Sequence, residues 1–165
     1  MRFLKFSIKM AIFGFISFIV IITALYTYAY LSPKLDLKKS GSMYIFDNQD
    51  NLIYQGSSSN EWANIEDISE HLKNAVIAVE DKNFYQHNGF DYLRIAKAMM
   101  LNIKKGGIVQ GASTISQQYV KNLYLDFDQN WSRKIEEAFL TLELEVHYDK
   151  DEILEGYLLI MGRET

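Results

Sequence analysis

The first strong pattern in the chain is an unbroken apolar run near its N-terminus. From Met10 to Leu31, MAIFGFISFIVIITALYTYAYL contains 22 residues and no charged side chain. As an α-helix this run is long enough to cross a hydrocarbon layer of about 30 Å. A cleaved signal peptide is the alternative. Its apolar core is usually only about 7–15 residues long, and the tyrosine-rich exit favours a retained anchor.

Basic residues before this run predict its orientation. Arg2, Lys5 and Lys9 precede it, and such positively charged flanks stay on the cytoplasmic side of a membrane. We therefore expect residues 1–31 to form a cytoplasmic stub and a single transmembrane helix, with everything after Pro33 on the outer side. The expected location is the cytoplasmic membrane, with an extracellular or periplasmic body.

A short polar linker and two strand-like runs follow the anchor. Met43–Phe46 and Leu52–Tyr54 are rich in strand-forming residues and flank a turn rich in Asn and Asp, which predicts a small β-hairpin. We assign residues 32–60 to this linker and hairpin, and residues 61–165 to a separate body.

From Asp67 onward the apolar positions follow a helical period. DISE, Asp67–Glu70, fits a capping box at a helix start. The positions that then recur at the spacing of one helix face are Leu72, Ala75, Val76 and Val79. Four more helices are predicted, over Tyr92–Ile103, Ser113–Asn122, Ser132–Tyr148 and Lys150–Ile160. The body is therefore expected to be mainly α.

Composition narrows the classes of function. The chain has 165 residues and no cysteine, which excludes a disulfide scaffold, a thiol nucleophile and a cysteine-ligated zinc site. Because the whole chain carries a net charge of −4 and residues 1–34 carry +4, the remainder carries −8. Such an acidic body makes nucleic acid a poor candidate partner.

The first cluster of candidate chemistry lies where the helix that starts near Asp67 ends. In AVEDKNFYQHNGFD, Glu80 and Asp81 are adjacent, and Phe84 and His87 follow. Neighbouring carboxylates disfavour each other's ionisation, which suits one of them to accept a proton near neutral pH. A solvated helix end is the structural alternative, and this cluster alone does not separate the two.

The second cluster is GASTISQQ, Gly111–Gln118. Thr114 and Gln117 fit a capping box that opens a helix. A helix start also presents free N–H groups and the positive end of the helix dipole to an anion. The basic residues near this start in the sequence are Lys104, Lys105, Lys121, Arg133 and Lys134. A plain helix cap and an anion-binding cradle both stay open, since surface lysines are usually only solvated.

Each of two further clusters, considered alone, has a purely structural explanation. The charged residues of Arg133–Glu145, RKIEEAFLTLELE, are typical of the solvent-exposed face of an amphipathic helix. KDEILEGYLLI places four apolar residues on one helix face, which indicates core packing. These residues are Ile153, Leu154, Tyr157 and Leu158.

In this order EDKNFYQHNG, GASTISQQ, RKIEE and KDEILEGYL resemble the motifs of the peptidoglycan glycosyltransferases, over about Ser42–Tyr157. That family forms the transglycosylase domain of bifunctional penicillin-binding proteins and also occurs as monofunctional enzymes. The resemblance implies a mainly α, lysozyme-like domain that polymerises lipid II at the outer face of the cytoplasmic membrane by an inverting mechanism. The implied partners are lipid II, the growing glycan strand, the membrane and cell-wall synthesis proteins.

The resemblance also implies roles for single residues. Glu80 matches the general base that takes a proton from the acceptor sugar. Glu137 matches a second essential acid, which assists departure of the donor's pyrophosphate directly or through a divalent ion such as Mg²⁺ or Mn²⁺. We expect the two glutamates to converge across a groove, and we assign no residue as a metal ligand. The positions expected to bind substrate or shape its site are Asp81, Phe84, His87, Ser113, Thr114, Gln117, Gln118, Lys121, Arg133 and Lys134.

The resemblance breaks off after Leu158. The family's fourth motif continues from Tyr-Leu into an asparagine, whereas Leu159 stands here. We therefore expect residues 61–165 to be a partial glycosyltransferase domain, truncated before the fifth motif. Two rival functions stay open. One is a non-catalytic membrane protein that binds lipid II or a cell-wall assembly partner. The other is a lytic hydrolase, against which GASTISQQ and the anchor argue.

Overall fold

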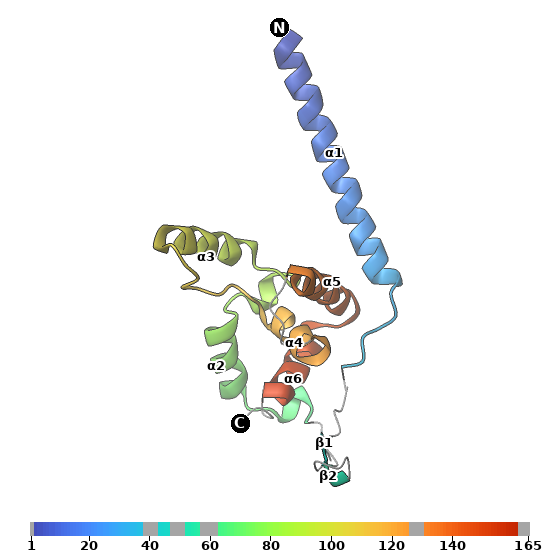
Figure 1. Ribbon diagram of the computed structural model, residues 1–165, viewed down its shortest axis with the longest axis vertical. Coiled ribbons are helices and arrows are strands. Elements are labelled where there is room, and N and C mark those ends of the chain that lie inside the picture. The colour runs from blue at the N-terminus through green and yellow to red at the C-terminus, as the bar shows by residue number, and fades with distance from the viewer. Residues whose placement is uncertain (1, 38–42, 47–51, 57–62, 126–130, 162–165) are drawn as a thin grey trace.

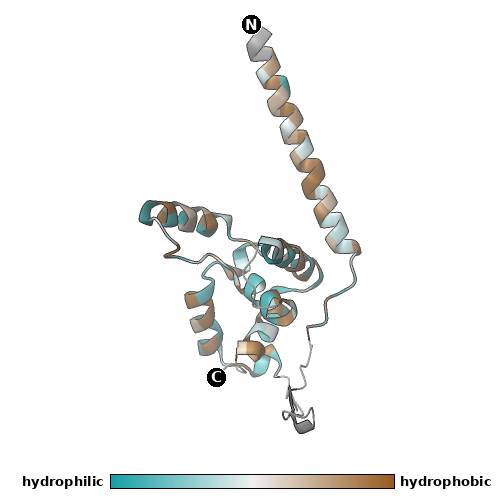
Figure 2. Cartoon of the chain, viewed as in Figure 1, coloured by the Kyte–Doolittle hydropathy of each residue, from teal (hydrophilic) through white to brown (hydrophobic). Residues whose placement is uncertain are grey.

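A long N-terminal helix rises from a body of shorter helices (Figure 1). This helix, α1, runs from Arg2 to Leu31. Within the described residues, Phe6–Leu31 is the one helix long and apolar enough to cross a membrane, and in Figure 2 hydrophobic residues recur along it. The computed structural model describes residues 2–37, 43–46, 52–56, 63–125 and 131–161.

Two short strands follow α1 in the chain. β1, Met43–Phe46, pairs antiparallel with β2, Leu52–Gly56, and the register shifts between Ile45 and Phe46. The turn that would join them falls on residues 47–51, outside the described residues. The β-hairpin therefore stays a prediction.

The body is mainly α, as the sequence predicted. Its α-helices are α2 (Glu70–Glu80), α3 (Tyr92–Lys105), α4 (Ile115–Tyr124), α5 (Trp131–His147) and α6 (Lys150–Met161). Two 3₁₀ turns, η1 (Ile65–Asp67) and η2 (Phe84–Gln86), precede and follow α2. Both ends of α3, α4, α5 and α6 lie within two residues of the predicted ends.

The capping box predicted at Asp67 is wrong. Asp67 closes η1, and α2 begins after Ser69, whose side chain makes no capping hydrogen bond. The cause is a contact distant in sequence. The backbone N–H of Ile65 donates to the Glu155 carboxylate of α6 over 2.6 Å, so η1 is held against α6 and the helix starts later.

The apolar face predicted for α2 is also displaced. Leu72 is 50% exposed and Val79 is 79% exposed. Of the predicted face, Val76 packs against the core, and it does so together with Ile77, which lies outside that face. In so short a helix, the buried stripe follows the direction of packing, which the spacing of apolar residues alone does not determine.

The core forms around α4, which packs against both α5 and α6. The capping box predicted at its start is present: Gln117 N–H donates to Thr114 Oγ1 and Thr114 N–H donates to Gln117 Oε1. The fully buried core residues are Phe84, Ile115, Tyr119, Val120, Leu144, Ile153, Leu154 and Tyr157. Three of the four residues on the predicted face of α6 are among them, and Leu158 packs beside them, so that prediction is confirmed.

A close approach between α4 and α6 requires glycine at position 156. A Cβ atom there would lie 1.9 Å from the Tyr119 hydroxyl oxygen and 2.4 Å from the ring carbon that bears it. Tyr119 is fully buried, so its ring has little space in which to move. The two helices can therefore pack at this distance only with glycine at the contact.

The chain that leaves α1 is held against the body by three tyrosines, here called the tyrosine strap. Their hydroxyls donate to three consecutive carbonyl oxygens: Tyr148 to Leu35, Tyr124 to Asp36 over 2.7 Å, and Tyr119 to Leu37 over 3.2 Å. The Lys34 ammonium also lies 5.0 Å from the centre of the Tyr148 ring. The start of the predicted linker is thus an ordered connection that fixes the end of α1 relative to the body.

Candidate active site

Asp81 sits at the end of α2 and joins three elements. Its side chain is fully buried and accepts a hydrogen bond of 3.1 Å from the backbone N–H of Ile115, the first residue of α4. His87 Nε2 lies 3.0 Å from the same carboxylate, and an Arg94 guanidinium nitrogen lies 3.8 Å from it. A carboxylate at this point also complements the positive end of the α4 dipole. Asp81 therefore fixes the position of the α4 start relative to α2.

His87 and Gly89 lead the chain from η2 toward α3. The His87 side chain is 9% exposed, and Gly89 has the left-handed φ of +83° that favours glycine. The Gly89 carbonyl oxygen accepts from the Thr114 hydroxyl over 2.7 Å. The first two predicted clusters are thus bonded to each other at the start of α4.

Glu80 and Asp81 are neighbours in sequence, but their carboxylates face different partners. Glu80 is half-buried, and its Oε2 accepts from Gln118 Nε2 over 2.9 Å. Its carbonyl oxygen accepts from the Arg94 guanidinium. Arg94 therefore contacts both acidic residues of the first cluster, a role that its position outside the predicted motifs did not reveal.

Glu137 is buried in α5, with 2% of its surface exposed. Its Oε1 accepts from Gln117 Nε2 over 3.2 Å and from the Lys134 ammonium. Lys134 lies one turn earlier on the same helix, and 44% of its side chain is exposed. The charged segment of α5 is therefore not only a solvent-exposed face, because the buried Glu137 carboxylate binds Lys134, whose side chain reaches the surface.

Adjacent glutamines of α4 thus receive the two glutamates separately. Gln117 donates to Glu137 and Gln118 donates to Glu80. The structure brings both predicted acids to one helix, on different faces of it. The shared groove expected between them stays a prediction, because neither glutamate lines the cavities described below.

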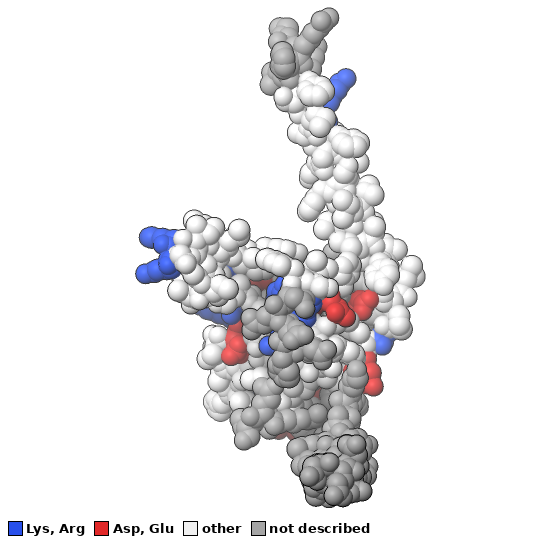
Figure 3. Space-filling view, in the orientation of Figure 1, with Lys and Arg blue, Asp and Glu red and all other residues white. Residues whose placement is uncertain are grey.

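The remaining predicted residues are more scattered. Phe84 lies in the core, with the Lys150 ammonium 4.5 Å from its ring centre, and Ser113 is half-buried just before the α4 cap. Lys104 and Lys105 end α3, and Figure 3 shows a basic cluster at that outer tip. Lys121 in α4 and Arg133 in α5 are half-buried. The basic cradle around the α4 start stays a prediction.

One polar cluster was not predicted from the sequence. Glu145 in α5 accepts from the Ser116 hydroxyl and, over 2.6 Å, from the Lys150 ammonium of α6. It joins α4, α5 and α6 beside the core. All three residues lie within quoted motifs, but nothing in the spacing links Glu145 to Ser116, which is 29 residues away.

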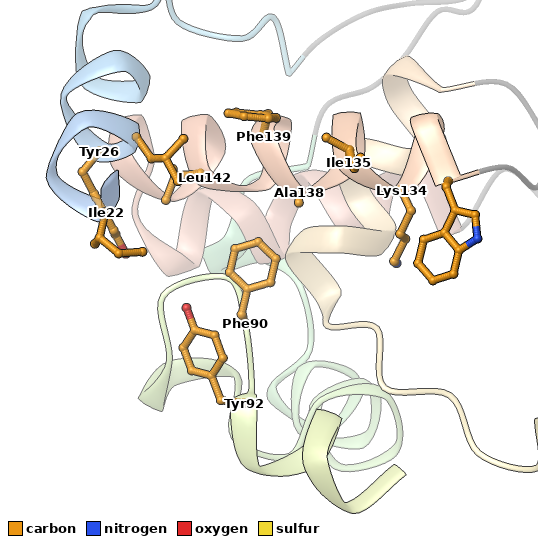
Figure 4. Close-up of a pocket in the computed structure, with 11 residues that line it drawn as sticks. Ile22, Tyr26, Phe90, Tyr92, Lys134, Ile135, Ala138, Phe139 and Leu142 are labelled. Atoms are coloured by element: carbon orange, nitrogen blue, oxygen red, sulfur yellow. The ribbon is translucent and has the colours of Figure 1, made fainter. Parts of the chain in front are cut away.

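An apolar cavity of about 330 Å³ lies between α1, α5 and the segment that enters α3 (Figure 4). Ile22 and Tyr26 of α1 line one side of it, and Phe90 and Tyr92 line another. Lys134 lies at the end away from Ile22 and Tyr26. A second cavity, of about 640 Å³, lies between α1 and α5 and includes Glu136 and Glu143. The membrane-length helix therefore forms part of the walls of both hollows.

The residues around Glu137 do not suit a divalent metal. Mg²⁺ and Mn²⁺ prefer several oxygen ligands, whereas Glu137 Oε1 already meets an ammonium and an amide N–H. Across the described part of the chain, no group of three or more His, Asp or Glu side chains is placed to hold an ion. The metal suggested by the resemblance therefore has no step in the mechanism below.

Comparison with known proteins decides the family. Residues 49–162 match the family model described as Transglycosylase. The chain belongs to the transglycosylase family. It is 44% identical over 127 residues to penicillin-binding protein 2D of Bacillus subtilis (strain 168), and 51% identical over 100 residues to the biosynthetic peptidoglycan transglycosylase of Nitrosospira multiformis. A third relative, penicillin-binding protein 1A of Neisseria cinerea, is 45% identical over 125 residues.

These matches differ in how much of each protein they cover. They include 77%, 61% and 76% of this chain, but only 18%, 44% and 15% of the respective relatives. The chain thus spans less than half the length of each of these relatives. The family predicted from the four motifs is confirmed, and the activity is taken up as a proposal.

Proposed function

We propose that this chain is a peptidoglycan glycosyltransferase that joins lipid II units into glycan strands at the outer face of the cytoplasmic membrane. Membership of the transglycosylase family supports the proposal, and one of the relatives is named a biosynthetic peptidoglycan transglycosylase. The membrane-length α1 supports a membrane-bound substrate. Arg2, Lys5 and Lys9 before the apolar run support a cytoplasmic N-terminus.

Glu80 is the general base in this proposal. A general base needs access to the substrate and a fixed orientation. Glu80 is only half-buried, which leaves it accessible, and the hydrogen bond from Gln118 to one of its oxygens fixes its orientation. The acceptor hydroxyl gives its proton to Glu80 as its oxygen bonds to the anomeric carbon of the donor. The bond from that carbon to the lipid diphosphate breaks on the opposite face, so the configuration inverts.

Lys134 stabilises the leaving diphosphate. The bond-breaking electron pair departs with the diphosphate, and a nearby ammonium lowers the energy of that negative charge. The buried Glu137 carboxylate holds the Lys134 ammonium, while nearly half of the lysine side chain stays exposed. Glu137 therefore assists departure by positioning Lys134. This contact between a buried acid and a lysine whose side chain is 44% exposed is the observation that carries the assignment.

The apolar cavity beside α1 fits the same class of substrate. Its volume of about 330 Å³ lies within the usual range of about 300–1,000 Å³ for ligand pockets. It reaches from the membrane-length helix to Lys134. A lipid-linked diphosphate has both an apolar chain and an anionic group, which match the two ends of this hollow.

The proposal is tested by incubating the purified chain in liposomes with labelled lipid II and no other protein. We expect glycan polymer on gels, and at least a hundred-fold loss of rate in Glu80→Gln. Glu136→Gln is the matched control, since Glu136 is an exposed acid of α5, and it should retain the wild-type rate. Lipid II binding without any polymer would instead identify a non-catalytic binding protein. Release of fragments from finished peptidoglycan would identify a lytic hydrolase, and polymer from Glu80→Gln would remove Glu80 from the base role.

A further inference from the structure

The fourth motif, KDEILEGYL, has a polar contact that its apolar pattern does not suggest. Tyr157 of α6 is fully buried in the core. Its hydroxyl nevertheless donates to the side-chain oxygen of Gln118 on α4 over 3.1 Å. The same Gln118 amide donates through its nitrogen to Glu80 over 2.9 Å. The three side chains form one chain of hydrogen bonds that runs from the core to the half-buried carboxylate.

Each end of the Gln118 amide has a different partner, and the order matters. A carboxylate only accepts hydrogen bonds, so the Gln118 nitrogen must face Glu80. The amide oxygen then points into the body, where it needs a donor, and Tyr157 supplies one. A hydrogen bond to the amide oxygen also polarises the amide and strengthens its N–H as a donor. Tyr157 thus holds Gln118 in the orientation that Glu80 requires.

We propose that Tyr157 is a positioning residue for Glu80 and acts through Gln118. The inference rests on the proposed function, in which Glu80 is the general base. Without the hydroxyl, the Gln118 oxygen has lost this donor, and the amide turns to seek another partner. Glu80 then loses a fixed hydrogen bond to Oε2 and samples orientations that do not reach the acceptor hydroxyl. A small displacement of a catalytic group of this kind costs rate even when the fold is intact.

Tyr157→Phe removes one oxygen atom and keeps the ring that fills the core. We expect kcat for lipid II polymerisation to fall about ten-fold, because Glu80 is less often aligned. KM should stay within two-fold, since Tyr157 is fully buried and does not touch substrate. Tyr119→Phe is the matched control: Tyr119 is equally buried, but its hydroxyl donates to Leu37. That variant should keep kcat within two-fold.

A double-mutant cycle separates positioning from general loss of structure. Gln118→Met removes the amide, so adding Tyr157→Phe to it should cause no further loss of kcat. The inference is overturned by equal, independent losses in both backgrounds, by a kcat unchanged in Tyr157→Phe, or by a fall in kcat that the Tyr119→Phe control shares. If Tyr157→Phe does not fold, Gln118→Met alone decides, because wild-type kcat in that variant would exclude any action through Gln118. A wild-type chain without activity would instead defeat the proposed function.

Discussion

The buried carboxylate of Asp81 accepts the first backbone N–H of α4, from Ile115, a residue 34 positions further along the chain. This single contact places the end of α2 against the start of α4. Glu80 and Gln118 lie on these same two elements and depend on that placement for their own hydrogen bond. The geometry around the proposed base is therefore set by a neighbour that does not itself face the substrate.

Asp81→Ala should destabilise the folded chain strongly. It leaves the Ile115 N–H and the His87 ring without a buried acceptor and removes the ion pair with Arg94. Removing one partner of a buried, hydrogen-bonded ion pair lowers the free energy of unfolding by about 3–5 kcal/mol. Thermal unfolding in detergent, followed by circular dichroism, measures the loss. Asp67→Ala, at an exposed acid, should change stability by less than about 0.5 kcal/mol. Equal effects of the two variants would contradict the role given to Asp81.

Gly156→Ala should disrupt the packing of α4 against α6. The added methyl group would lie 1.9 Å from the Tyr119 hydroxyl oxygen. Forcing such overpacking on a buried ring costs about 3 kcal/mol or more. Gly107→Ala is the control, because in the part of the chain that the structure describes no atom beyond its chain neighbours lies within 4 Å of the added carbon. Thermal unfolding of both variants tests this, and a Gly156→Ala chain as stable as Gly107→Ala would show that the helices do not pack this closely.

The stability of α3 should depend on pH through Asp91, its N-cap. The backbone N–H of Arg94, and then the Asn83 side chain, donate to the Asp91 carboxylate and hold its pKa below the usual value. A lowered pKa stabilises the folded state above the unfolded value of about 3.9, and that contribution disappears as pH falls through the folded value.

Asp91→Asn can still cap α3 but no longer titrates. The difference in Tm between wild type and Asp91→Asn should therefore shrink as the pH is lowered from 6 to 3. Glu66→Gln, at an exposed acid, should leave the pH dependence of the wild type unchanged. A constant difference in Tm across this range would contradict the stabilising role of the Asp91 charge.

Loss of the tyrosine strap should expose the connection after α1 to protease. A hydroxyl hydrogen bond contributes about 0.5–1.5 kcal/mol, so Tyr124→Phe combined with Tyr148→Phe should ease local opening on the order of ten-fold. Trypsin cleavage after Lys34, identified by mass spectrometry, reports this opening. Cleavage after Lys105 at the tip of α3 serves as an internal control. Unchanged cleavage at Lys34 would mean that the strap does not protect the connection.

The sequence predicted the elements well where a local rule governs them. The Thr114 cap of α4 and the buried face of α6 were both predicted, because a capping box and a helical period depend only on nearby residues. The capping box at Asp67 failed because η1 is held by Glu155, which is distant in the sequence. Local patterns cannot report a competing contact of that kind.

The candidate site shows the same limit. Family resemblance selected Glu80 and Glu137, but pattern alone could not reveal that adjacent glutamines of α4 bind them separately. It also missed the buried Glu145 with its partners Ser116 and Lys150, and the path from Tyr157 to Glu80. Each of these contacts depends on how α4 packs with α2, α5 or α6, which is a property of the tertiary structure.

The tyrosine strap also constrains how the body can meet its surroundings. With Leu35, Asp36 and Leu37 held in place, the body cannot rotate freely about the end of α1. With α1 in a membrane, as proposed, a molecule in the same lipid layer would approach by lateral diffusion and meet a body that keeps one face toward the bilayer. The search would be two-dimensional, and the tilt of the body relative to the lipid layer would stay constant during it.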